Sequence, residues 1–121
     1  MTGKEENFSE IFDKKDFFDR VEGDLELARE LGEMFIDETR QTMDLIRDFI
    51  GQKDADGIRR AAHSLKGASA NLSANRVRRI SADLEQAARE NRMSVAVEIF
   101  PLLEDEVANF TTELERHVFG R

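Results

Sequence analysis

The sequence predicts an all-α fold, an up-down antiparallel four-helix bundle with one or two short N-terminal covering helices. Apolar residues recur at the helical period over most of the chain, and no stretch shows sustained strand alternation or an Asn-Gly hairpin. The loops between the periodic segments are short, and short loops join antiparallel neighbours. The 121 residues have room for one domain, which we take as 1–121, with flexible ends expected at 1–7 and 119–121.

The clearest helix is predicted over 25–50, where one side is apolar and the opposite side is charged. At 1.5 Å per residue this helix would be about 40 Å long. Asp24 is a candidate N-cap, and Gly51 is a candidate for the residue that closes the helix. The apolar stripe is centred on Phe35 and also contains Leu25, Ala28, Leu31, Met43, Ile46, Phe49 and Ile50.

Three further helices complete the predicted bundle. Two shorter segments run over about 54–72 and 76–90, with Asp54 and Asn75 as candidate caps. The last helix contains Pro101, which should bend or restart it within its first turns. Its apolar stripe consists of Ala96, Ile99, Phe100, Leu103, Val107, Phe110, Leu114 and Val118. The short covering helices, broken at 13–16, are predicted around an apolar cluster of Phe8, Ile11, Phe12, Phe17 and Phe18.

Composition excludes several classes of function. The net charge of -8 repels phosphate backbones and anionic lipid surfaces, so nucleic-acid binding is not expected. The absence of cysteine excludes disulfides, thiolate zinc sites and cysteine nucleophiles, and it is typical of a reducing compartment. No run approaches the roughly 20 apolar residues that a bilayer span needs, and the first residues lack a signal-peptide pattern. The expected location is the cytoplasm.

In the helix predicted over about 54–72, one histidine points away from the core. Stepping 100° per residue from His63 places Leu65 and Leu72 on the opposite face. Cations beside an imidazole disfavour its protonated form, which leaves a nucleophilic ring nitrogen, and they stabilise a phosphoryl group that arrives there. A glycine one turn on costs about 1 kcal/mol of helix propensity and leaves a bare patch for another protein. The side that carries His63 holds three cations and two very small residues, namely Arg59, Arg60, Lys66, Gly67 and Ala70.

From His63 to Ala74 the chain reads His-Ser-Leu-Lys-Gly-Ala-Ser-Ala-Asn-Leu-Ser-Ala, which resembles the phosphorylation motif of histidine-containing phosphotransfer (HPt) domains. That motif is His, any residue, Leu, Lys, Gly, then small residues and a closing Leu-Gly-Ala, on one helix of a four-helix bundle. One departure is Ser73 in place of the closing glycine, so we expect the left-handed terminator at Asn75. The resemblance covers 15–118 and includes Glu22-Gly-Asp24, Arg60-Ala-Ala62 and Leu84-Glu85.

The resemblance implies a phosphorelay intermediate. His63 would accept a phosphoryl group from an aspartyl phosphate on one receiver domain and pass it to an aspartate on another. Lys66 would neutralise the phosphoryl oxygens, and Gly67 would leave room for the receiver. The sequence has neither a Gly-rich nucleotide loop nor a metal-binding acidic cluster, so the chain is expected to be a phosphocarrier without kinase activity of its own.

The same resemblance sets the expected partners. These are response-regulator receiver domains, a hybrid sensor histidine kinase, or both. No cofactor is expected on this chain, and the divalent metal ion that supports transfer is expected on the receiver. A monomer is expected, since His63 needs only a receiver opposite it. Whether the domain is free-standing or part of a larger hybrid kinase is left open.

Several residues have a competing, purely structural interpretation. Arg59, Arg60 and Ala70 are candidate docking residues, and a solvated helix face is the alternative for the two arginines. His117 is interpreted as a packed or dipole-satisfying residue near a helix C-terminus. The basic run formed by Arg76, Arg78 and Arg79 is interpreted as surface charge.

Two other classes of function were weighed. A helical scaffold that never carries phosphate is the main alternative, and it predicts that His63→Gln leaves receiver binding and function unchanged. A di-iron bundle enzyme requires a Glu-x-x-His motif on two helices. No acidic residue stands three positions before either His63 or His117, which argues strongly against such an enzyme.

Overall fold

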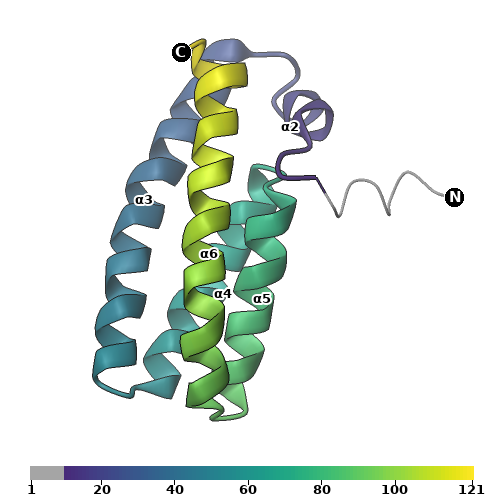
Figure 1. Ribbon diagram of the computed structural model, residues 1–121. Coiled ribbons are helices and arrows are strands. Elements are labelled where there is room, and N and C mark those ends of the chain that lie inside the picture. Colours follow the sequence, from purple (N-terminus) through teal and green to yellow (C-terminus); the bar gives the residue numbers. More distant parts are fainter. Residues whose placement is uncertain (1–9) are drawn as a thin grey trace, which may run out of the picture.

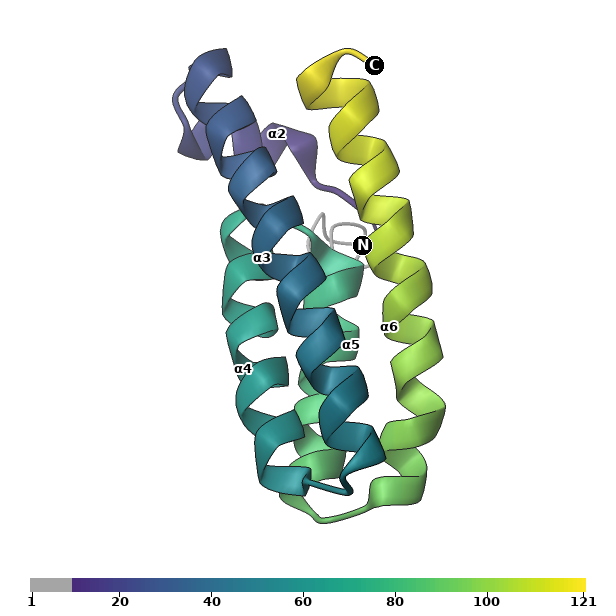
Figure 2. The ribbon, with the colours of Figure 1, turned by 90° about the vertical axis from the view of Figure 1, so that its left-hand side faces the viewer.

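Four long antiparallel helices form the body of the molecule, and a short helix lies against one end of it (Figures 1 and 2). This computed structural model describes residues 10–121, so Phe8 and the expected flexible end at 1–7 lie outside the described part. Residues 10–121 contain no strand, and the predicted all-α bundle is confirmed. The elements are α2 (Lys14–Arg20), α3 (Leu25–Gly51), α4 (Ala55–Asn71), α5 (Asn75–Arg89), α6 (Met93–Leu114) and a π-helical turn, η1 (Glu115–Phe119).

The predicted capping chemistry starts three of these helices. Asp13, Asp24 and Asp54 stand directly before α2, α3 and α4, and each carboxylate accepts a backbone N–H three residues on, at 2.9 to 3.1 Å. A cap of this kind contributes about 1 kcal/mol, because it satisfies a donor that the helix itself leaves unpaired. The caps predicted at Asp24 and Asp54 are confirmed, and the break expected at 13–16 is the start of α2.

Two helix ends differ from the prediction. Gly51 is the last residue of α3, but the left-handed conformation that closes the turn belongs to Lys53, with φ 56°. At the start of α5 the cap position is Ala74, one residue before the predicted Asn75, and Ala74 offers no side-chain cap. The physical reason is the same in both turns. A short turn between two helices fixes the backbone conformation of every residue in it, so the capping position is not set by the residue with the best local propensity.

The end of α4 also corrects the prediction at Ser73. This serine is itself left-handed, with φ 57°, although Asn75 was expected to take that conformation. Its hydroxyl donates to the Asp16 carboxylate at 2.6 Å, and its carbonyl accepts from the Asp13 N–H at 3.0 Å. These bonds to the α2 region offset the cost of the left-handed backbone, which is about 1 to 2 kcal/mol for a residue with a Cβ.

Helix α6 is continuous from Met93 to Leu114, so Pro101 does not restart it as the sequence suggested it could. Pro101 is exposed, while Phe100 and Leu103 on either side are buried and anchor the neighbouring turns in the core. The last residues of the chain, where a flexible end was expected at 119–121, make contacts with the bundle. The Phe119 ring packs against Gly32, and the Arg121 N–H donates to the Glu115 carbonyl at 2.7 Å.

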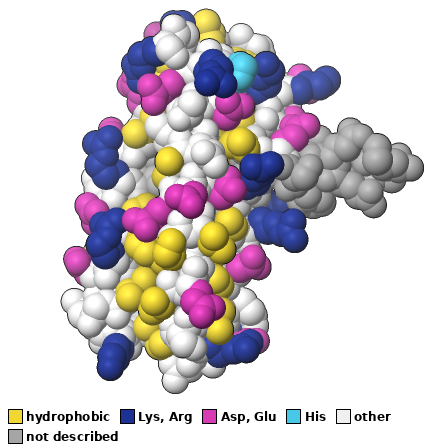
Figure 3. Space-filling view, in the orientation of Figure 1, with side chains coloured by type: hydrophobic (Ala, Val, Ile, Leu, Met, Phe, Trp, Pro, Cys, Tyr) yellow, Lys and Arg dark blue, Asp and Glu magenta, His cyan; other side chains and the backbone are white. Residues whose placement is uncertain are grey.

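The four long helices enclose one apolar core. Phe110 is fully buried in it, with its ring edge-on to Phe12 and to Phe35 at centroid distances of 5.2 Å. Most of the predicted apolar stripes are buried, although Leu25 at the start of α3 is exposed. On the outside of α6, Val97 and Leu102 are exposed, and Figure 3 shows that apolar and acidic side chains share this face.

Candidate functional site

His63 lies midway along α4, on the side away from the core. Its side chain is 65% exposed, whereas Leu65 and Leu72 of the same segment are buried. The orientation predicted from the helical wheel is therefore the orientation in the structure. Because the opposite face of α4 is packed, the imidazole is presented to solvent from a rigid support.

A buried carboxylate, which the sequence analysis mentioned only as part of the resemblance, lies under this imidazole. Glu85 on α5 has a side chain that is only 3% exposed. Its Oε2 atom lies 2.9 Å from Nδ1 of His63 and 3.0 Å from a guanidinium nitrogen of Arg89, and its Oε1 atom lies 2.7 Å from Nζ of Lys66. One carboxylate thus holds the imidazole and two cations together across the α4/α5 contact.

The charge of Glu85 follows from these contacts. Burial raises the pKa of the Glu85 carboxyl, but the hydrogen bonds from Lys66 and His63 outweigh burial and bring this pKa below its ordinary value. Glu85 is therefore ionised near neutral pH and can only accept hydrogen bonds. The proton between it and His63 must lie on Nδ1, so a neutral ring carries its free lone pair on Nε2.

The two arginines predicted beside His63 are held by a different carboxylate. Arg59 donates to Oδ1 of Asp56 at 2.9 and 3.2 Å, and Arg60 donates to Oδ2 of the same residue at 3.1 Å. The hydrogen bond from Arg59 is the largest cause that lowers the pKa of the Asp56 carboxyl. Each of the three cations predicted on this side of α4 is therefore paired with a carboxylate, Arg59 and Arg60 with Asp56 one turn earlier and Lys66 with Glu85.

Gly67 leaves open space beside His63. A Cβ atom built at this position would have no other atom within 4 Å, which fits the bare patch that the sequence predicted. Gly57, on the same helix, is different, because a Cβ there would lie 2.6 Å from the ring of Phe49. Ala70, a turn beyond Gly67, is half-buried and adds only a methyl group to the surface.

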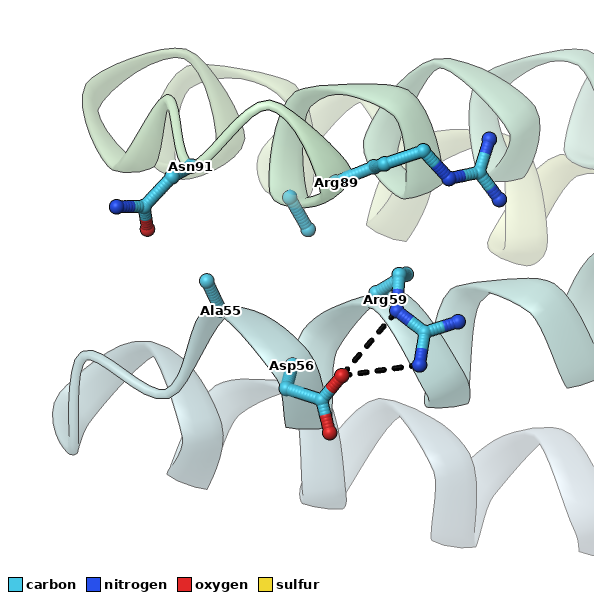
Figure 4. Close-up of a pocket in the computed structure, with 6 residues that line it drawn as sticks. Ala55, Asp56, Arg59, Arg89 and Asn91 are labelled. Atoms are coloured by element: carbon cyan, nitrogen blue, oxygen red, sulfur yellow. Dashed lines mark hydrogen bonds and ion pairs between the residues drawn. The ribbon is translucent and has the colours of Figure 1, made fainter.

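A hollow opens next to this site, between the N-terminal end of α4 and the C-terminal end of α5 (Figure 4). Arg59 lines it from α4 and Arg89 lines it from α5, so there is one arginine on each side of the hollow, and the two side chains extend in the same direction in Figure 4. Arg89 also binds Glu85, the carboxylate that contacts Nδ1 of His63, so Arg89 connects the hollow to the His63 site. The lining residues are Ala55, Asp56, Arg59, Ala88, Arg89 and Asn91.

His117, the second histidine, lies in the turn η1 and has a side chain that is 30% exposed. Its Nδ1 atom is 3.4 Å from Nζ of Lys14, and its Nε2 atom is 3.7 Å from a carboxylate oxygen of Glu113. Both ring nitrogens therefore face charged side chains. This agrees with the structural role that the sequence indicated.

No helix within residues 10–121 is long and apolar enough to cross a membrane. In the same part of the chain, no group of three or more His, Cys, Asp or Glu side chains is placed to hold a metal ion.

The fold and the site define a class of protein, a helical bundle with one exposed imidazole supported by a buried carboxylate. The family model of the Hpt domain matches residues 30–113, and the chain belongs to this family of histidine-containing phosphotransfer domains. A search of curated protein sequences found no match. The chain is similar in fold to histidine-containing phosphotransfer protein B (HptB) from Pseudomonas aeruginosa PAO1, with a TM-score of 0.87 and 20% identity over 93% of this chain and 98% of that one.

Membership of the family establishes the general function. The chain is a phosphocarrier of a phosphorelay, of the histidine phosphotransfer type. The matched range contains His63, Lys66, Gly67 and Glu85, and so it contains the whole site described above.

Proposed function

We propose that His63 is the residue that carries the phosphoryl group. The observation that supports this most directly is an exposed imidazole whose Nδ1 atom is 2.9 Å from a buried, ionised carboxylate. That contact leaves Nε2 as the nucleophilic nitrogen and holds the ring at one angle. The donor is an aspartyl phosphate on one receiver domain, and the acceptor is an aspartate on another.

Transfer to the chain is an in-line displacement at phosphorus. Nε2 of His63 forms the new N–P bond, while the bond between phosphorus and the aspartyl oxygen breaks and releases the aspartate as a carboxylate. Glu85 stabilises the positive charge that develops on the imidazole, because its carboxylate accepts a hydrogen bond from the N–H group at Nδ1. Passing the group to the next receiver reverses these steps, with the acceptor aspartate as nucleophile.

Lys66 supplies the positive charge that acts on the phosphoryl group. It lies three residues after His63 on the same helix and is bound to Glu85 at 2.7 Å, so its ammonium group is held close to the imidazole. In this role Lys66 neutralises the phosphoryl oxygens during transfer. The charge on the phosphoryl group is thereby balanced without a metal ion bound by this chain, and we assign the divalent ion to the receiver.

The partner approaches over α4 in this proposal. Gly67 provides the close contact, and Arg59, Arg60 and Ala70 form the docking surface around it. The partners are receiver domains of response regulators, of a hybrid sensor histidine kinase, or of both. The chain acts as a monomer and has no kinase activity of its own, since its contribution is one nucleophile and its supporting charges.

The test is transfer of labelled phosphate from receiver domains phosphorylated with acetyl phosphate. The wild-type chain should gain label that is lost in acid and stable in base, as expected for phosphohistidine. His63→Gln should gain none while it keeps the wild-type circular dichroism spectrum, and the matched variant His117→Gln should gain as much label as the wild type. Equal label on His63→Gln would contradict the assignment and would leave a scaffold without phosphate as the better explanation for this site.

A further inference from the structure

The charge of the molecule is divided between two halves of the bundle. Helices α4 and α5 together carry seven basic and three acidic residues, whereas α3 and α6 carry three basic and twelve acidic residues. The overall net charge of -8 therefore conceals a cationic half that contains His63. Figure 3 shows acidic and apolar side chains along the middle of the face that α6 occupies, with basic side chains mainly around the edge of the view.

Within the cationic half, two clusters each place two cations on a single carboxylate. Arg59 and Arg60 share Asp56, and Lys66 and Arg89 share Glu85. Each cluster therefore has one positive charge that its own carboxylate does not balance. A guanidinium has five N–H donors, so Arg59 keeps donors for a further acceptor after binding Asp56.

The two clusters meet at the hollow between α4 and α5. Arg59 belongs to the first cluster and Arg89 to the second, and they approach this hollow from its two sides (Figure 4). Asp56 is the only acidic side chain among the six lining residues, and its carboxylate is already bound by both arginines of its own helix. The hollow is thus suited to a carboxylate supplied from outside.

We propose that this hollow receives an acidic side chain of the receiver domain, and that the charge division of the bundle orients the receiver over α4 and α5. The inference rests on the proposed function of His63, because the partner must carry an aspartate to that residue. A partner whose reacting face is rich in carboxylates is attracted by the half with net positive charge and repelled by the α3/α6 half. The attraction acts on encounter, before any contact with the imidazole.

Two arginines of this chain make a matched pair for the test. Arg59 on α4 and Arg47 on α3 each bind an aspartate three residues earlier, at 2.9 and 3.0 Å respectively. Arg47 also binds Glu104 of α6 at 2.9 Å, and the side chains of this second pair are 54% and 42% exposed. Arg59→Gln and Arg47→Gln change the net charge of the protein by the same amount, but only Arg59 lies at the hollow. Both variants should fold, because exposed ion pairs of this kind contribute little to stability.

The experiment measures the second-order rate of label transfer from a phosphorylated receiver at low and at high salt. The receiver is the member of a purified panel that labels the wild-type chain fastest. We expect Arg59→Gln to lower this rate about threefold to tenfold at low salt, and Arg47→Gln to leave it unchanged. The deficit should disappear near 0.5 M salt, because screening acts within a few ångströms there.

A second phosphodonor separates this inference from the proposed function. Phosphoramidate is a small molecule with no docking surface, so it should label His63 equally in the wild type and both variants. Equal effects of the two substitutions, or a deficit that persists at high salt or with phosphoramidate, would overturn the inference while leaving His63 as the carrier. If no receiver in the panel labels His63 of the wild type, the proposed function fails and the inference fails with it.

Discussion

The two histidines of this chain have similar neighbours but different access to solvent. Each has a glutamate and a lysine close to its ring, Glu85 and Lys66 for His63, and Glu113 and Lys14 for His117. At His63 both charged groups bind each other and only Nδ1 is engaged. At His117 one charged group faces each nitrogen.

This difference is the reason why we propose His63, and not His117, as the phosphorylated residue. A ring with one nitrogen held by an acceptor and the other directed to open space can act as a nucleophile. A ring that is only 30% exposed and whose two nitrogens face charged side chains of the same molecule, as at His117, is less accessible to an incoming phosphoryl group. Proximity of charged residues therefore does not by itself mark a phosphorylation site, and the direction of each contact must be known.

Among the substitutions that test this comparison, we expect Glu85→Gln to have the largest effect on the rate of transfer. The amide can either donate or accept at Nδ1, so the tautomer with a free Nε2 is no longer enforced. We expect the rate of transfer from a phosphorylated receiver to fall roughly tenfold to a hundredfold, as when one preorganised electrostatic contact is removed. The rate should be measured by single-turnover loss of label from the receiver.

The matched control for this variant is Glu113→Gln, which changes the glutamate beside His117. Its transfer rate should equal that of the wild type, because Glu113 has no contact with the α4/α5 site. If both variants lose the same fraction of activity, the carboxylate under His63 has no special role in transfer.

A substitution at Gly67 is expected to have a smaller effect on transfer. It should slow transfer and at the same time make the fold more stable. Gly67→Gln fills the open patch, so we expect transfer from a receiver to fall about tenfold while phosphoramidate still labels His63. The same substitution should raise the free energy of unfolding by about 0.5 to 1 kcal/mol, because glycine is a poor helix former. Urea denaturation and the two labelling assays measure these quantities.

Gly51 provides the control for that substitution. It is also helical and exposed, and a Cβ atom there would meet nothing within 4 Å. Gly51→Gln should leave both labelling routes unchanged, since Gly51 lies at the far end of α3 from the α4 patch. A loss of receiver transfer in this variant would show that the open space at Gly67 is not what the receiver requires.

The smallest expected effect concerns acid stability. Since the pKa of Glu85 is lower in the folded chain than in the unfolded chain, its ionised form stabilises the fold above the unfolded pKa, and this contribution is lost as the pH falls through the folded pKa. The wild type should exceed Glu85→Gln by about 0.5 to 1 kcal/mol at pH 7, because His63, Lys66 and Arg89 lose a charged acceptor and their partial exposure to solvent limits that loss. Urea titrations at pH 7 and below pH 4 should show this difference shrinking, and a constant difference would contradict an ionised Glu85.

Local sequence signals were sufficient for the helices, their starts and the outward direction of His63. Asp24 and Asp54 lie just before long apolar-periodic segments, and both act as caps as expected. The same local reasoning misplaced the helix ends, because Lys53 and Ser73 are left-handed for reasons that lie in the turns and in α2. Ser73 shows this well, since its stabilising partners, Asp16 and Asp13, are about 60 residues away in the chain.

Glu85 shows a similar limit at the functional site. In sequence it stands 22 residues from His63, on a different predicted helix, and only an i,i+4 pairing with Arg89 marked it locally. A glutamate on the inner side of a helix is a useful signal, because a buried carboxylate requires partners. Those partners could not be named before the packing of α4 against α5 was known.

The sequence alone determined that this chain is a helical bundle and that one imidazole points out of it, because helical period and capping depend on residues within a few turns of one another. The tertiary structure decided which nitrogen of that imidazole is free, where Lys66 and the arginines bind, and how charge is divided between the two halves. Those features depend on contacts between helices, and the energy of such a contact is set by distance and burial that the order of residues does not contain.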